Sequence, residues 1–126
     1  MAALVFDAGA LIALERGDRT VIALLALAAL QGTEAITSSA VVAQVWRDPA
    51  RQARLTRALG GVLEFPLDAL VARRCGLLLA TAGSSDIADA ALALLVADGD
   101  TVLTSDPHDI EHLLETTGTN ARIRPV

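Results

Sequence analysis

Three short acidic segments, far apart in the chain, contain the side chains best suited to chemistry. Asp7 ends an apolar run near the start, Asp86 and Asp89 open a second segment, and Asp106 and Asp109 open a third. Carboxylates within about 4 to 6 Å repel one another, which raises pKa values and destabilises a fold unless a cation shares the site. Magnesium or manganese suits carboxylate oxygens and water, and such a site activates water for phosphodiester hydrolysis.

Each acid also has a purely structural interpretation. Asp106 before Pro107 fits a helix N-cap followed by proline at the first helical position, and Asp109 is then a first-turn acid favoured by the helix dipole. Asp86 and Asp89 show the same pattern at the start of another helix. One such element alone would indicate a cap, so the chemical interpretation requires that the segments converge.

Strands that alternate with helices would position these acids. Apolar runs predict strands at 3–6, 35–37, 62–65, 101–104 and 121–124. Helices are expected at 8–14, 19–31, from 38 or 39 to 48, at 50–59, from 68 to about 80, at 87–97 and at 107–116. Asp18 and Gly32 should bound the second helix, and Asp48-Pro49 should end one helix and cap the next.

This alternation predicts a single α/β domain over residues 1–126, with a four- to five-stranded parallel sheet flanked by helices. Ligands of such sheets bind beyond the carboxyl ends of the strands, where the strand order reverses. Asp7 and Asp106 both follow predicted strands. Their carboxylates would meet, despite their separation in sequence, if those two strands are neighbours.

Composition narrows the classes of function. All 10 basic residues are Arg, which excludes mechanisms that need a lysine amine. A net charge of -5 argues against general electrostatic attraction to nucleic acid, so any RNA contact must be local. The longest apolar run, 21–30, is too short to span a bilayer, and the start lacks a signal-peptide pattern. We therefore expect a soluble, cytoplasmic protein without a membrane segment.

Two further stretches are candidates for binding surfaces. Arg47, Arg51 and Arg54 recur at helical spacing and would hold RNA phosphates, although a solvated helix face explains the same pattern. The apolar stretch 21–30 is continuous enough to be buried on several sides, by the core or by a partner. Cys75, the single cysteine, is expected to be a small buried side chain without chemistry.

Taken together, the acidic segments resemble the three motifs of PIN domains, particularly those of VapC-type toxins of bacterial toxin–antitoxin pairs. The matching segments are Phe6-Asp7-Ala8-Gly9, Ser85-Asp86-Ile87-Ala88-Asp89 and Thr104-Ser105-Asp106-Pro107-His108-Asp109. The resemblance covers essentially the whole chain and implies a three-layer PIN-like domain. It also implies a magnesium- or manganese-dependent endoribonuclease that cleaves structured RNA such as tRNA. Partners would be a cognate VapB-like antitoxin and a second copy in a homodimer.

Carried over position by position, the resemblance implies Asp7, Asp89 and Asp106 as the catalytic acids. The implied metal ligands are Asp7, Asp86, Asp89, Asp106 and Asp109, with Gln44 and Ser105 beside them. Gln44 departs from the pattern, because family members commonly have glutamate there. A neutral amide supplies no charge and cannot act as a base, although Asp86 would make up the charge from the same helix face as Asp89.

Two other functions stay open at this point. The glutamine at position 44 is also compatible with a PIN-like RNA-binding or regulatory module that has weak or no nuclease activity. A receiver-type phosphoacceptor domain has similar length, element order and strand-end aspartates. Receivers, however, need an acidic pair after the first strand and a lysine after the last, whereas this chain has only Asp7 and no lysine.

Overall fold

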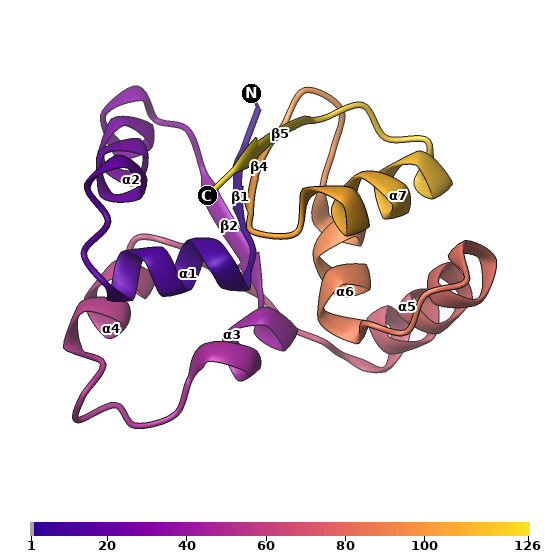
Figure 1. Ribbon diagram of the computed structural model, residues 1–126, viewed down its shortest axis with the longest axis horizontal. Helices are drawn as coiled ribbons and strands as arrows, with labels where there is room; N and C mark the ends of the chain where they lie inside the picture. Colours follow the sequence, from indigo (N-terminus) through magenta and orange to yellow (C-terminus); the bar gives the residue numbers. More distant parts are fainter. Residues whose placement is uncertain (1) are drawn as a thin grey trace.

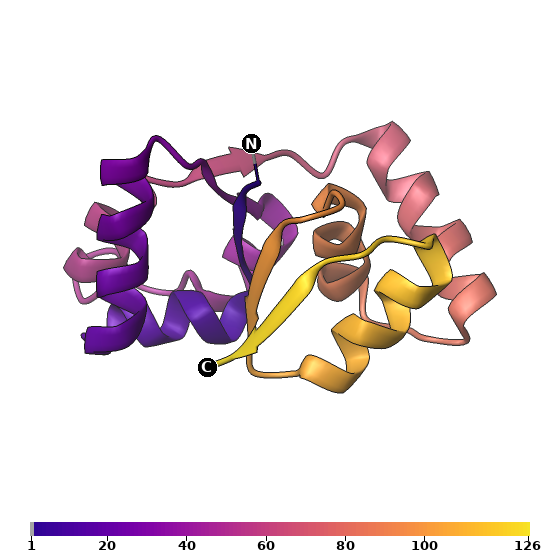
Figure 2. The ribbon, with the colours of Figure 1, turned by 90° about the horizontal axis from the view of Figure 1, so that it is seen from above.

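The computed structural model describes residues 2–126 and contains one parallel sheet covered by helices on both faces (Figure 1). Its elements are β1 (Leu4–Phe6), α1 (Ala8–Glu15), α2 (Arg19–Gln31), β2 (Ala35–Ser38), α3 (Ser39–Val45), α4 (Ala53–Leu59), β3 (Leu63–Phe65), α5 (Ala69–Ala82), α6 (Ile87–Leu95), β4 (Thr101–Thr104), α7 (Pro107–Thr117) and β5 (Arg122–Pro125). Seen from above, α1, α2 and α4 lie on one side of the sheet and α5, α6 and α7 on the other (Figure 2). The predicted three-layer α/β architecture is confirmed; residue 1, which the predicted domain includes, lies outside the described residues.

Strand β1 lies at the centre of the sheet, whose order is β3-β2-β1-β4-β5. All neighbouring strands are parallel. Phe6 pairs with Leu103 in register, so β1 and β4 end side by side. The order reverses at this pair, because β2 and β3 extend the sheet on one side and β4 and β5 on the other. The strands that precede Asp7 and Asp106 are therefore neighbours at the topological switch point.

The core is formed mainly by the central strands and α6. Val5, Phe6, Val102 and Leu103 are fully buried, as expected for strands covered on both faces. Helix α2, by contrast, buries only Val21 and Ala28. Leu24 and Leu25 are partly buried against the core, whereas Ile22, Leu27 and Leu30 are 44%, 48% and 85% exposed. The apolar run 21–30 is thus buried along one face, and the opposite face is open.

Local capping signals account for most helix bounds. Asp18 accepts a hydrogen bond from the Val21 N–H at 3.0 Å, and Gly32 ends α2 in the left-handed conformation. The predicted cap at Asp48 is wrong, because α4 begins only at Ala53, after Gln52. The Asp48 carboxylate instead accepts from the Ala50 N–H at 3.1 Å, within a turn between α3 and α4.

Helix α5 packs against α6 and exposes an apolar edge. Leu70 and Leu77 are 59% and 71% exposed, whereas Cys75 is buried and burial raises the pKa of its thiol.

Within residues 2–126 no single helix has the length and hydropathy to cross a membrane. The pair formed by α5 and α6, bent by 105°, meets that test by length and composition.

Candidate active site

Asp7 is a buried carboxylate at the junction of β1 and α1. Its Oδ1 accepts hydrogen bonds from the Gly9 and Ala10 N–H groups at 2.7 and 3.3 Å, which caps α1. Its Oδ2 accepts from the Thr104 hydroxyl. The side chain is only 4% exposed, and burial raises its pKa above the ordinary value, although these hydrogen bonds oppose the rise. The local cap thus fixes the orientation of the carboxylate at the sheet edge.

Thr104, the last residue of β4, connects two of the acids. Its fully buried hydroxyl donates to Asp7 and accepts from the Asp106 N–H at 2.9 Å. Sequence reasoning missed this residue, because a threonine in a strand is unremarkable. The available signal was its place at the end of the strand that neighbours β1, immediately before the third acidic segment.

Asp106 occupies the N-cap position of α7, but its side chain makes no capping hydrogen bond. Its backbone has φ −121 and ψ 63, and Pro107 follows at the first helical position. Proline has no N–H to satisfy, which reduces the need for a capping side chain. Asp106 therefore has the expected N-cap position but not the side-chain hydrogen bond of a cap, and its exposed carboxylate is available for other partners.

The starts of α6 and α7 meet at a pocket of about 230 Å³. Asp86 caps α6 by accepting from the Asp89 N–H at 2.9 Å, and Asp109 lies in the first turn of α7. Three carboxylates contribute to its lining, which consists of Ser84, Ser85, Asp86, Asp89, Asp109 and Leu113. Two acidic segments that are distant in sequence therefore share one concave surface.

The pKa of Asp89 indicates that the acids are close to one another. Its pKa is raised to about 7, first by burial and then by the negative charges of Asp86, Asp7, Asp106 and Asp109. All five predicted acids therefore belong to one electrostatic cluster. The cluster carries no internal counter-charge, since the one ion pair found among residues 2–126, between Arg51 and Asp48, lies elsewhere.

A divalent cation suits the chemistry of this donor set. Carboxylate oxygens are the ligands that magnesium and manganese prefer, and a cation would relieve the repulsion that raises the pKa of Asp89. In the described part of the chain, however, no three Asp, Glu, His or Cys side chains are arranged to hold a metal ion as they stand. Side-chain rotation, above all of the exposed Asp86, Asp106 and Asp109, would be needed to form a coordination shell.

Ser105 lies against the first turn of α1. A Cβ atom added at Gly9 would come within 2.3 Å of Ser105 Oγ and 2.5 Å of Ser105 Cβ. Only glycine therefore allows the β4–α7 connection to approach α1 so closely. Ser105 therefore lies next to Gly9, which follows Asp7 by two residues, and so beside the cluster.

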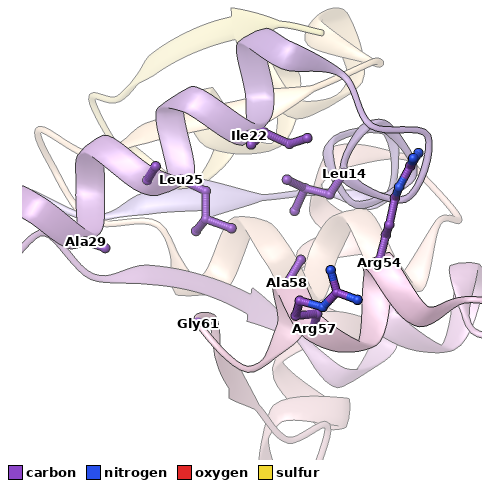
Figure 3. Close-up of a pocket in the computed structure, with 9 residues that line it drawn as sticks. Leu14, Ile22, Leu25, Ala29, Arg54, Arg57, Ala58 and Gly61 are labelled. Carbon is purple, nitrogen blue, oxygen red and sulfur yellow. The ribbon is translucent and has the colours of Figure 1, made fainter.

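Gln44 does not line the acidic pocket. It lies in a separate open groove of about 680 Å³, together with Arg16, Arg47 and Arg51. Arg54, by contrast, lines an apolar pocket of about 420 Å³ between α2 and α4 (Figure 3). The predicted stripe of arginines is therefore divided between two surfaces. Arg16, which sequence reasoning did not single out, joins Arg47 and Arg51 because the end of α1 lies next to the α3–α4 loop.

Comparison with known proteins identifies the fold. A chain of the crystal structure of VapBC2 from Rickettsia felis, bound to a DNA fragment from their promoter, matches with a TM-score of 0.70 and 14% sequence identity. The match covers 97% of this chain and 98% of that chain. No protein-family model matches the sequence, and a search of curated proteins finds no significant match. The likeness at this identity concerns the fold, which is PIN-like and similar to that of the VapBC2 chain.

Proposed function

We propose that this protein is a metal-dependent endoribonuclease of the VapC kind, which hydrolyses phosphodiester bonds in structured RNA such as tRNA. The observation that carries the proposal is the group of five carboxylates without a counter-charge; burial and then the charges of the other four acids raise the pKa of Asp89 to about 7. Such a cluster destabilises an isolated protein, and a function that recruits a cation accounts for it. The PIN-like fold supports the same assignment by analogy.

In this proposal Asp7, Asp89 and Asp106 are the catalytic acids. Together with Asp86 and Asp109, they would hold Mg²⁺ or Mn²⁺. When bound, the cation would polarise the phosphate and lower the pKa of a bound water molecule.

The protein's own groups have separate tasks. Thr104 and the Gly9 and Ala10 N–H groups hold Asp7 in one orientation. Asp106 and Asp109 project from the start of α7 without capping bonds that would restrain them. Asp89 is half-buried beside the other four acids, so a bound cation would favour its charged form and lower its raised pKa.

We also propose a VapB-like antitoxin as partner, since the VapBC2 structure contains a chain of the same fold. The pocket between α2 and α4 is the surface best suited to an apolar peptide segment. It is lined by Leu14, Ile22, Leu25 and alanines of both helices, with Arg54 and Arg57 at its margin (Figure 3). A homodimer remains part of the proposal, and size-exclusion chromatography with light scattering would test it.

A second candidate function is a PIN-like RNA-binding or regulatory module with weak or no nuclease activity. Gln44 favours this candidate, because it supplies no charge and lies outside the acidic pocket. The two candidates differ in their response to metal. A ligand that binds only the folded state raises stability by mass action, so a functional metal site predicts a higher Tm with Mn²⁺ or Mg²⁺.

The decisive experiment is cleavage of total tRNA by the purified protein with Mg²⁺ or Mn²⁺. Asp106→Asn and Asp7→Asn are expected to lower the rate by at least about a hundredfold, because each removes a charge from the cluster. Glu111→Gln, on the exposed side of α7, is a matched control that also removes one negative charge. Equal cleavage by wild type and Asp106→Asn would reject the nuclease, as would metal-independent cleavage.

A further inference from the structure

We propose that the groove beside Gln44 binds the phosphodiester backbone of the RNA, next to the acidic site. We call it the arginine groove and define it by Arg16, Gln44, Arg47 and Arg51. Its lining residues come from α1 and its end, from the end of α3 and from the connection between α3 and α4. This inference rests on the proposed function and adds to it the surface that would hold the substrate.

Gln52 builds the loop that presents two of the arginines. Its side chain is 5% exposed, and its Oε1 accepts from the Arg47 and Asp48 N–H groups at 2.9 and 3.0 Å. Its Nε2 donates to the Val45 carbonyl at 2.8 Å. One buried amide thus satisfies three backbone groups of an irregular loop, which would otherwise be costly to bury. The groove is therefore held in place before any ligand arrives.

Arg47 is oriented further by the end of α3. Its Nη1 donates to the carbonyls of Ala43 and Trp46 at 3.0 and 2.7 Å. The guanidinium has five N–H donors in all, so other donors stay available to a ligand. Arg51 lies 3.6 Å from the Asp48 carboxylate, and both side chains are exposed. An exposed pair of this kind is weak and yields readily to a phosphate.

The charges around the groove favour an anion. The charged residues that line the groove are Arg16, Arg47, Arg51, Glu15 and Asp48. The positive charges outnumber the negative ones, so the groove has a net positive charge although the whole chain has a net charge of -5. Gln44 preserves this excess. A glutamate at this position would balance the three cations with a third carboxylate. The neutral amide of Gln44 therefore suits a groove that binds an anion. In this interpretation Gln44 has a role in substrate binding and is not merely a replacement for a metal ligand.

The groove adjoins the acidic site through α1 and α3. Helix α3 packs against both α1 and α6, and α6 carries Asp89 (Figure 1). Arg16 follows Asp7 by nine positions, which corresponds to about 13 Å along a helix. One RNA strand can span that distance, with one phosphate at the acids and others at the arginines.

The position of the groove favours RNA over an acidic peptide. Guanidinium groups pair with phosphate and carboxylate oxygens alike, but the groove lies along α1 from Asp7, where the proposed function places the RNA, and contacts to phosphate position a nucleic acid without reading its sequence. The groove is lined largely by charged and amide side chains. An apolar surface for a peptide lies instead between α2 and α4, where Leu14, Ile22 and Leu25 line the neighbouring pocket.

The test measures affinity for fluorescein-labelled tRNA by anisotropy in EDTA, so that cleavage does not interfere. The double variant Arg16→Gln/Arg51→Gln is expected to bind about tenfold more weakly and to lower the slope of log K against log salt by about 1.4 to 1.8. Gln44→Glu should weaken binding about threefold. The matched control Arg73→Gln/Arg74→Gln, on the exposed side of α5, should stay within about twofold of wild type. Circular dichroism checks that all variants are folded.

Unchanged RNA affinity and salt slope in the groove variants would overturn the inference. It would also be overturned if the double variant lost binding to a polyglutamate peptide while it kept tRNA binding, which would indicate a surface for acidic peptides. Cleavage with Mg²⁺ is scored separately in the wild type. If RNA binding depends on the groove but the wild type does not cleave RNA, the nuclease proposal is rejected and the groove proposal stands. If the wild type cleaves RNA but binding does not depend on the groove, the groove proposal is rejected and the nuclease proposal stands.

Discussion

The Thr104 hydroxyl donates a hydrogen bond to the Asp7 carboxylate and so joins the ends of two strands that are 97 positions apart in sequence. The same oxygen accepts from the Asp106 N–H, which sets the start of the third acidic segment. One buried hydroxyl therefore fixes the relative position of two acids that no local interaction could bring together.

Thr104→Val should weaken this connection while it keeps the side-chain shape. The variant leaves Asp7 Oδ2 and the Asp106 N–H without their partner, so we expect a loss of about 1 to 3 kcal/mol in the free energy of unfolding. The pKa of Asp7 should rise further, because a hydrogen bond that lowers it is removed. Urea unfolding measures the loss, and Mn²⁺ titration followed by Tm should show weaker binding. Thr104→Ser keeps the hydroxyl and is expected to behave like wild type; equal defects in Val and Ser would contradict the prediction.

Asp89 should make stability fall as pH rises toward neutrality. Its pKa is about 7 in the folded protein against an ordinary value of 3.8, so the folded state binds more protons than the unfolded state between these values. The contribution is therefore fully present below about pH 4 and is lost as pH passes 7. Without screening, the contribution of Asp89 to the free energy of unfolding would be about 4 kcal/mol. Because the group is only half-buried, solvent screening reduces this contribution to about 1 to 2 kcal/mol.

Thermal unfolding at pH 5 and pH 8, without divalent metal, measures this dependence. Wild type should lose about 5 °C in Tm on account of this group, and Asp89→Asn should show a flatter profile. Mg²⁺ or Mn²⁺ at pH 8 should restore stability to wild type more than to Asp89→Asn. Identical pH profiles for the two proteins would exclude Asp89 as the titrating group.

Gly9→Ala should force the first turn of α1 away from the β4–α7 connection. The added Cβ would lie 2.3 Å from Ser105 Oγ and 2.5 Å from Ser105 Cβ, and rotation about χ1 does not move that Cβ, so a side-chain rotation alone cannot relieve the contact. We expect a destabilisation of about 1 to 3 kcal/mol and slower RNA cleavage. The control is Gly76→Ala in α5, where nothing lies within 4 Å; it should stabilise the protein by about 0.5 to 1 kcal/mol.

Gln52→Leu should loosen the connection between α3 and α4. The Arg47 and Asp48 N–H groups would lose their acceptor, and we expect a loss of about 2 to 4 kcal/mol in the free energy of unfolding. Gln52→Glu keeps an acceptor for these N–H groups, but it buries a charge and turns an oxygen toward the Val45 carbonyl, so we expect a cost at least as large. Hydrogen exchange of residues 46–52 would show whether the loop opens. Unchanged protection in Gln52→Leu would mean that the loop is held by other contacts.

Local signals explain which parts of the fold the sequence predicted. Helix α2 has the predicted bounds because Asp18 and Gly32 act on their own neighbours, and β4 matches because an apolar run lies between two turns. The cap expected at Asp48 failed because Gln52, a residue with no strong positional preference, organises that turn through three backbone groups. Such a role depends on a folded loop and leaves no local pattern.

The site shows the same division. The carboxylates could be identified by residue type, and strand ends indicated where Asp7 and Asp106 would lie. The position of Thr104 at a strand end was visible in the sequence, but its hydrogen bond to Asp7 was not. Arg16 and the separation of Arg54 from Arg47 could not be predicted, because they depend on how α1 and the α3–α4 loop pack together. The position of Gln44 also required the structure, which places it among arginines and apart from the acidic pocket.

The central position of β1 has a consequence for synthesis of the chain. Its partner β4 is synthesised well after it, and at about 5 to 20 residues per second Asp106 follows Asp7 by about 5 to 20 s. Until then, one edge of β1 has no strand to pair with, and the carboxylates stay apart. The acidic cluster therefore assembles only after synthesis has passed Asp106, and any property that needs both Asp7 and Asp106 is absent from a chain that stops before that residue.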